Sequence, residues 1–160
     1  MEFKFTEENQ TKIEDILKRY PTKKAAVMPL LYLAQGQNGW VSSEVMKVVA
    51  SLLDMPADEV LGVVTFYTMY RQKSMGKYHL QVCTNVSCML RGAYKIYDHI
   101  KDKLNIANGG VTEDAIFSLE EVECMGSCGT APMIAVNEDF FENLDVEKVD
   151  QILESFKNKN

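Results

Sequence analysis

Two pairs of cysteines constrain this chain more than any other feature of its sequence. Cys83 and Cys88 are spaced C-x4-C, Cys124 and Cys128 are spaced C-x3-C, and the chain contains no other cysteine. Four thiols suit one site with four thiolate ligands, or two disulfides. In a reducing compartment, cysteine pairs more often bind metals or act in catalysis than form structural disulfides.

Composition indicates the compartment in which these thiols reside. The formal net charge is −6, so no basic surface is expected, and we exclude nucleic acid as a partner. The first residues are charged and lack the apolar core of a signal peptide. No run approaches the roughly 18 apolar residues that would span a membrane. We therefore expect a protein of the cytoplasm, or of the inner side of an organelle, with no membrane insertion.

Apolar residues in the first half recur at the spacing of one-sided helices. Four helices are expected, over residues 7–20, 23–37, 43–53 and 56–70. Thr6 caps the first and Ser42 or Ser43 the third, because a hydroxyl there accepts a hydrogen bond from a free backbone N–H. Pro29 lies inside the second helix, which is therefore either kinked there or begins later.

Residues 1–72 are thus predicted to form a helical, helix-turn-helix-like domain. This domain contains no cysteine and no histidine. The acidic balance of the chain favours a docking domain for a protein partner over DNA binding. Each large apolar side chain alone is more typical of a core position. The candidates for a docking surface are nevertheless Trp40, Phe66, Tyr67, Met69 and Tyr70.

The second domain, residues 73–160, begins in a polar segment with one glycine, residues 72–77. Its expected elements are a strand with one buried face over 78–83, a helix over 90–104, a strand over 116–123, a hairpin over 133–136 and 140–144, and a helix over 146–156. The order β-α-β-β-β-α is thioredoxin-like. The predicted fold class is α+β or α/β, with a helical bundle preceding this domain.

Both cysteine pairs begin where a predicted strand ends. Cys83 closes the first strand, and Cys124 follows the second. Open sheets that contain parallel strands place their ligand sites beyond the carboxyl ends of those strands. We therefore expect the two pairs to lie close enough to share one centre.

The spacings bear on which centre the thiols hold. Structural zinc sites typically use C-x2-C pairs arranged tetrahedrally around one ion. The longer loops here suit a 2Fe–2S cluster better, because it has two irons that each need two thiolates. Zinc, disulfides and free thiols remain open on this argument alone.

Two other kinds of cysteine site lack residues that they require. A Rieske centre needs two histidine ligands, and the two histidines, His79 and His99, lie outside the cysteine loops. His99 falls on the polar side of its helix and is expected to be solvated. Thioredoxin-type redox chemistry requires C-x-x-C at a helix start, which is absent.

Several loop residues are expected to tune a cluster with four thiolates. Gly126 and Gly129 permit turns that direct backbone N–H groups at sulfur. Hydroxyl donors, which raise a reduction potential, are available from Thr84, Ser127 and Thr130. Negative charges that lower it precede the second pair at Glu120, Glu121 and Glu123.

The loops resemble those of a known family. Cys-Thr-Asn-Val-Ser-Cys-Met-Leu-Arg-Gly at 83–92 and Cys-Met-Gly-Ser-Cys-Gly-Thr-Ala-Pro-Met-Ile-Ala-Val-Asn at 124–137 resemble the 24-kDa, or E-type, family of chains in NADH–quinone oxidoreductase (complex I). Residues 33–40 and 62–69 look like the same family, and the resemblance covers about residues 10–155. Met125 and Ser127 depart from the family's commoner Leu and Ala, and neither is a ligand.

This resemblance implies a thioredoxin-like 2Fe–2S domain behind a helical one. The cluster ligands that it implies are Cys83, Cys88, Cys124 and Cys128. It also implies tight pairing with the 51-kDa, F-type subunit, which carries FMN and binds NADH, and contact with other peripheral-arm subunits. The location implied is cytoplasmic, peripheral to the inner side of the membrane through the complex.

The function so implied is electron transfer within an NADH dehydrogenase. The cluster exchanges single electrons with the partner's flavin, and the isolated chain is a carrier without catalytic residues. The chain has no G-x-G-x-x-G motif or P-loop, so no nucleotide site of its own is expected. The alternatives are the equivalent subunit of an NAD-linked or bifurcating hydrogenase or formate dehydrogenase, a zinc-stabilised interaction module, and a thiol–disulfide oxidoreductase.

Overall fold

A computed structural model describes residues 3–159 of the chain. The chain divides into two compact units, Met1–Ser74 and Met75–Asn160. Each unit has its own apolar core, and the division falls inside the polar segment 72–77. No helix among the described residues is long and apolar enough to cross a membrane.

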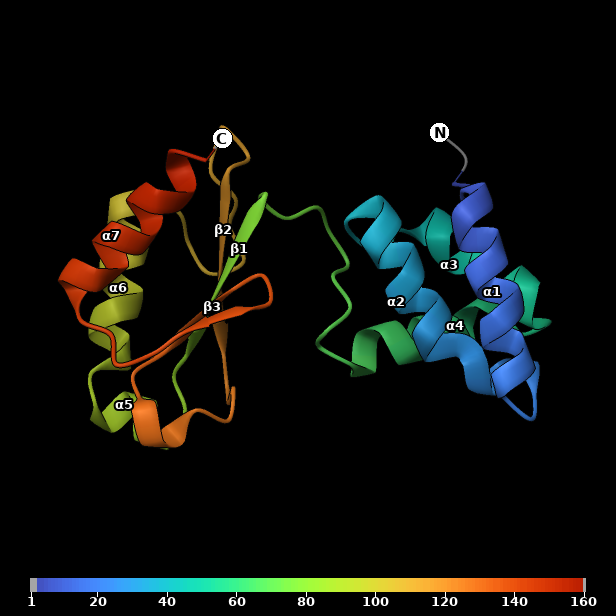
Figure 1. The fold of residues 1–160 in the computed structure, drawn as a ribbon, viewed down its shortest axis with the longest axis horizontal. Helices are drawn as coiled ribbons and strands as arrows, with labels where there is room; N and C mark the ends of the chain where they lie inside the picture. Colours follow the sequence, from blue (N-terminus) through green and yellow to red (C-terminus); the bar gives the residue numbers. More distant parts are fainter. Residues whose placement is uncertain (1–2, 160) are drawn as a thin grey trace. The chain divides into compact units, whose positions relative to one another are not determined.

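The first unit is helical, as the spacing of its apolar residues predicted (Figure 1). Its elements are α1 (Glu7–Arg19), the 3-10 turn η1 (Lys23–Ala26), α2 (Val27–Asn38), α3 (Ser43–Leu53) and α4 (Ala57–Phe66). The Thr6 side chain accepts a hydrogen bond from the backbone N–H of Asn9, and that of Ser42 accepts one from Val45. These bonds satisfy amides that the first turn of a helix leaves free. Of the two serines considered as the cap of the third helix, Ser42 is the one used.

Two helix ends differ from the prediction, the start of α2 and the end of α4. Because α2 begins at Val27, Pro29 lies in its first turn, where a missing N–H costs nothing. The later start is therefore correct. Helix α4 ends at Phe66 and not near residue 70, and Tyr70 turns back so that its hydroxyl donates to the Met28 carbonyl at 2.9 Å.

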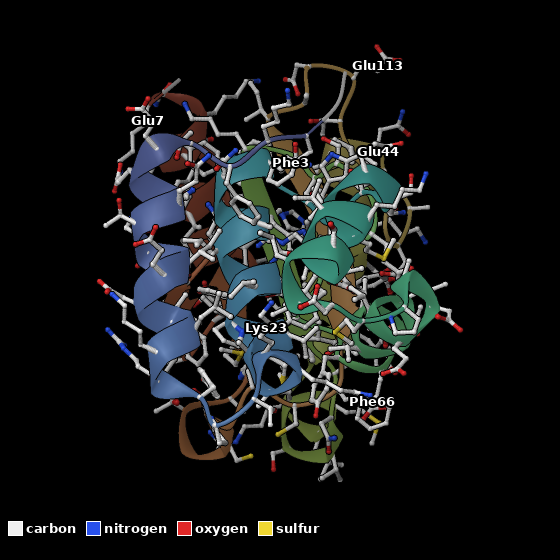
Figure 2. The ribbon with its side chains drawn as sticks, turned by 90° about the vertical axis from the view of Figure 1, so that its right-hand side faces the viewer. Phe3, Glu7, Lys23, Glu44, Phe66 and Glu113 are labelled. Carbon is white, nitrogen blue, oxygen red and sulfur yellow. The ribbon has the colours of Figure 1, made fainter. Side chains whose placement is uncertain are left out.

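The candidate docking residues separate into two groups. Tyr70 is buried, and burial raises its pKa to about 12, so it belongs to the core and its assignment to a docking surface is wrong. Phe66 is 77% exposed, and Tyr67 and Met69 are also exposed. Figure 2 shows Phe66 at the edge of the helical unit. Trp40 is half-buried.

The second unit is a mixed sheet with helices on one face. Its elements are β1 (Tyr78–Cys83), α5 (Val86–Leu90), α6 (Ala93–Leu104), β2 (Phe117–Val122), the 3-10 turn η2 (Cys128–Thr130), β3 (Ile134–Val136), β4 (Asp139–Phe141) and α7 (Val146–Lys157). Within the described residues the strand order is β2-β1-β3-β4, with β1 parallel to β2 and antiparallel to β3. Helices α6 and α7 cover one face (Figure 1). The expected thioredoxin-like order is confirmed.

Two local expectations for this unit are wrong. The helix expected over 90–104 is interrupted, because Gly92 adopts a φ of +91° between α5 and α6. Leu90 therefore leaves the apolar stripe and is largely exposed. Strand β1 buries residues on both faces, since His79 and Cys83 are as inaccessible as Leu80.

Gly76 allows the chain entering β1 to approach β2 closely. A Cβ at this position would lie 2.4 Å from the backbone carbonyl carbon of Phe117, which is closer than non-bonded atoms approach. We predict that Gly76→Ala lowers the free energy of unfolding of the second unit by about 1–3 kcal/mol through overpacking. Urea denaturation measures this change, and Gly62→Ala, where a Cβ meets open space, is the control. A loss no larger than in the control would contradict the prediction.

Candidate metal centre

Adjacent parallel strands bring the two cysteine loops to one edge of the sheet. Cys83 is the last residue of β1 and pairs with Val122, the last residue of β2. The pairing continues beyond the strands, where the backbone N–H of Thr84 donates to the Val122 carbonyl at 3.0 Å. Cys124 follows two residues after Val122, so both loops start at the carboxyl ends of paired strands, as expected.

The first loop folds into α5 and buries both of its thiols. The Asn85 side chain begins this helix by accepting a hydrogen bond from the backbone N–H of Val86 at 2.7 Å. Cys83 and Cys88 are 3% and 2% exposed. They pack in a small apolar cluster with Ala93, Ala131 and Met133. This cluster shields the first pair from water.

The second loop leaves its thiols exposed, both at Cys124 and at Cys128. Gly126 between them has a φ of +83°, which glycine adopts without steric cost. Gly129 lies in η2 with a φ outside the left-handed region. The expectation of a special turn therefore holds for Gly126 and not for Gly129.

Electrostatics couple thiols from the two loops. Burial raises the pKa of the Cys88 thiol to about 11, and a hydrogen bond with Cys83 and the charges of Cys83 and Cys128 act in the same direction. The Cys83 thiol donates to the Glu123 carbonyl at 3.2 Å. These contacts favour the protonated thiols. A bound metal ion favours the thiolates instead, because coordination deprotonates a thiol outright.

The donor set fits an iron–sulfur centre. All four thiols are free, and each loop contributes one pair, which matches two irons that each need two thiolates. No three His, Cys, Asp or Glu side chains within residues 3–159 lie close enough to hold a single metal ion.

Comparison with known families identifies the kind of protein to which these loops belong. Residues 13–157 match the family described as thioredoxin-like 2Fe–2S ferredoxin. The chain belongs to this family. It is also 44% identical to the E chain of the NADH-quinone oxidoreductase of Rickettsia bellii over 159 residues, 98% of this chain and 95% of the relative. The corresponding chain of Rickettsia felis is 42% identical with the same coverage.

The fold recurs in a larger solved protein. It superposes on an NAD+-reducing NiFe-hydrogenase in the air-oxidized state with a TM-score of 0.74 and 19% sequence identity. The similar region covers 83% of this chain and 23% of the hydrogenase chain. The ferredoxin-family chain thus spans less than a quarter of that protein, and the likeness concerns the fold.

Family membership confirms the expected cofactor, one 2Fe–2S cluster. The zinc-stabilised module and the thiol–disulfide oxidoreductase lose their basis, since the family is a ferredoxin family. The assignment of Cys83, Cys88, Cys124 and Cys128 as the ligands stays a prediction, which the placement of both loops at one sheet edge supports.

Two of the loop hydroxyls of this ferredoxin donate to oxygens of the chain. The Thr84 hydroxyl donates to the Glu121 carboxylate at 2.8 Å, and the Thr130 hydroxyl donates to the Ser127 carbonyl at 3.3 Å. The nearby hydroxyls of Ser127 and Thr130 lower the pKa of the Glu142 carboxyl. The expectation that loop hydroxyls tune the cluster stays a prediction.

Both histidines have protein partners, contrary to the expectation that His99 is simply solvated. The His99 Nε2 lies 2.7 Å from the Asp150 carboxylate and joins α6 to α7. His79 is buried between the Ser118 hydroxyl and the Glu120 carboxylate, each at 2.9 Å. This second network was missed. Its signal was available, because parallel pairing with β2 places these polar residues on one face of the sheet.

We predict two classes of thiol in the metal-free ferredoxin. Near pH 8, Cys124 and Cys128 react quickly with iodoacetamide because they are exposed. Cys88 is buried with a pKa of about 11, so only about 0.1% of it is thiolate, and its alkylation accelerates about tenfold per pH unit. Timed quenching and peptide mass spectrometry measure the rates, with urea-unfolded protein as the control. Equal rates for all thiols in the folded chain would contradict this prediction.

Proposed function

We propose that this chain is the electron-transfer subunit of an NADH–quinone oxidoreductase, with Cys83, Cys88, Cys124 and Cys128 as ligands of its 2Fe–2S cluster. The observation that carries the proposal is that paired parallel strands deliver both cysteine loops to one edge of the sheet. The identity of 42–44% over nearly the whole length of two such chains from NADH-quinone oxidoreductases supports this function over the others.

The residues of the chain hold the cluster and control its surroundings. A bound 2Fe–2S cluster supplies one-electron chemistry, and the protein sets its position and potential. The buried first pair excludes water on one side. The exposed second pair leaves the other side accessible to solvent or to a partner. A buried and an exposed pair together suit a carrier that exchanges electrons across a protein surface.

The partner proposed is the 51-kDa, F-type subunit, which would hold FMN and NADH. Beside the first cysteine pair, α5 and the start of α6 expose four large apolar side chains: Val86, Met89, Leu90 and Tyr94. Isolated exposed apolar residues are common, whereas such a group next to a redox site suits a protein interface. Phe66, Tyr67 and Met69 give the helical unit a second surface of this kind, which supports its role in docking, to this or to other peripheral-arm subunits on the cytoplasmic side.

The first test is the metal content of anaerobically purified protein. About two irons and two acid-labile sulfides per chain, with a rhombic S = 1/2 EPR signal after dithionite reduction, support the proposal. Zinc, or no metal after reconstitution with iron and sulfide, would refute it.

The second test is assembly with the flavin-binding partner. We predict that Leu90→Ser weakens binding about tenfold or more, because truncating a buried interface anchor costs roughly 1–2 kcal/mol. Phe140→Ser, which truncates a half-exposed ring on β4, is the control. Affinity is measured by titration of the purified partner. Equal affinities for the two variants would show that α5 is not part of the interface. Preferential assembly with a hydrogenase would favour the alternative function.

A further inference from the structure

Arg91 is the only charged residue in the two cysteine loops. Residues 83–92 and 124–137 contain no other Asp, Glu, Lys or Arg. A 2Fe–2S cluster with four thiolate ligands carries a net negative charge, and the net charge of such a centre is one of the properties that set its reduction potential. Arg91 is therefore the one cation that the loops themselves bring to the proposed site.

The Arg91 side chain joins the first loop to the second. Its backbone N–H donates to the Cys88 carbonyl at 3.1 Å, and its guanidinium Nη1 donates to the Ala131 carbonyl at 3.3 Å. Ala131 follows Cys128 by three residues and is buried. It packs in the small apolar cluster that holds both thiols of the first pair. The guanidinium thus lies at the edge of this cluster and holds the segment that follows the second pair.

The Ala131 carbonyl differs from its neighbours in the donor that it receives. Backbone N–H groups donate to the carbonyls around it: those of Thr130, Pro132 and Met133 accept from Asn143, Leu144 and Cys83. The Ala131 carbonyl accepts from the Arg91 side chain, and a buried carbonyl that loses its donor is destabilising. Arg91 and Pro132 also border a pocket of about 340 Å³, so the packing between the two segments is incomplete there.

We propose that Arg91 is a positioning residue for the cluster, with two separable effects. Its hydrogen bond to Ala131 holds the two cysteine loops together and slows the loss of the cluster. Its positive charge stabilises the reduced cluster, which carries one negative charge more than the oxidised cluster, and so raises the reduction potential. This inference rests on the proposed ligand role of the four cysteines.

Three substitutions separate these effects. Arg91→Met keeps an apolar stem and removes both the charge and the donors. Arg91→Lys keeps the charge, whereas Arg91→Gln keeps an amide donor without the charge. Lys101→Met, which removes the same charge from the last turn of α6, is the matched control.

The reduction potential measures the effect of the charge. It is determined by EPR-monitored redox titration of the full chain, with iron content as a check on loading. We expect Arg91→Met and Arg91→Gln to shift the equilibrium away from the reduced cluster about threefold to tenfold, which lowers the potential by about 28 to 59 mV for a one-electron couple. Arg91→Lys and Lys101→Met should keep the wild-type potential. A wild-type potential in both neutral variants, or an equal fall in Arg91→Lys, would overturn the proposal.

The alkylation rate of Cys88 measures the contact between the loops and needs no cluster. In the metal-free chain, separation of the loops admits iodoacetamide to this buried thiol. We expect Arg91→Met to accelerate the alkylation about fivefold to tenfold, because hydrogen bonds from charged donors are among the stronger ones. Release of iron from the loaded chain to a chelator should accelerate similarly. Rates equal to those of Lys101→Met would overturn the proposed contact.

The two measurements distinguish failure of this inference from failure of the proposed function. If Arg91→Met retains no cluster, Arg91→Gln decides the effect on the potential and the alkylation rates decide the contact. A wild-type chain without a 2Fe–2S cluster would refute the proposed function and, with it, the effect on the potential. The alkylation rates would still decide whether Arg91 joins the loops.

Discussion

Alanine in place of any one of Cys83, Cys88, Cys124 or Cys128 is expected to abolish the 2Fe–2S cluster. Each iron needs two thiolates from the protein, and the loops fold around the metal that they bind. Iron and acid-labile sulfide should fall from about two per chain to near zero. The visible absorption and the EPR signal of the reduced protein should disappear with them.

His99→Gln is the matched control for these variants. It replaces the group that joins α6 to α7 through Asp150 and removes no proposed ligand. Its iron content should equal that of the wild-type chain. Full loading of an alanine variant, or cluster loss from His99→Gln, would show that the ligand set is wrong.

Leu80→Ala is expected to cause the largest loss of stability among the substitutions considered. Leu80 lies in the middle of β1, is fully buried, and is paired in register with Leu119 on β2 and Val136 on β3. Its truncation leaves a cavity that three strands border and that cannot collapse, at a cost of about 3 kcal/mol. Amide exchange in β1 and β2 of the metal-free chain should then accelerate about 100-fold, if these amides exchange by unfolding of the unit.

Leu90→Ala deletes the same atoms from an exposed position. Leu90 is 77% exposed on α5, so its truncation should change stability by less than about 0.5 kcal/mol. Exchange in β1 and β2 should match that of the wild-type chain. Equal effects of the two leucine variants would mean that the sheet does not carry the stability of this unit.

The sequence predicted the elements that local chemistry decides. The hydroxyls of Thr6 and Ser42 begin helices where they were expected, because a cap depends on residues within one turn. Strand β1 has its predicted bounds, Tyr78–Cys83. Contacts from distant parts of the chain decided the rest. Tyr70 is held in the core by a hydrogen bond from its hydroxyl to the Met28 carbonyl. No periodicity within residues 56–70 reveals this contact.

The candidate site shows the same division. The place of both cysteine pairs followed from where their strands end. The partner of the Thr84 hydroxyl did not, because Glu121 reaches it from the neighbouring strand β2. Side-chain hydrogen bonds between loops depend on tertiary placement, and neither spacing nor composition records it.

The separate cores of the two units have a consequence for damaged copies of the chain. The apolar cluster of the helical unit draws on residues 3–70, and those of the ferredoxin unit draw on residues 78–156. Unfolding of the chain is therefore not expected to be a single cooperative event. A copy that has lost its iron would keep a folded helical unit, with Phe66 and its neighbours still exposed. If the helical unit docks as proposed, such a copy would compete with intact chains for a place in the complex. Activity of the complex would then fall in proportion to the share of copies without a cluster.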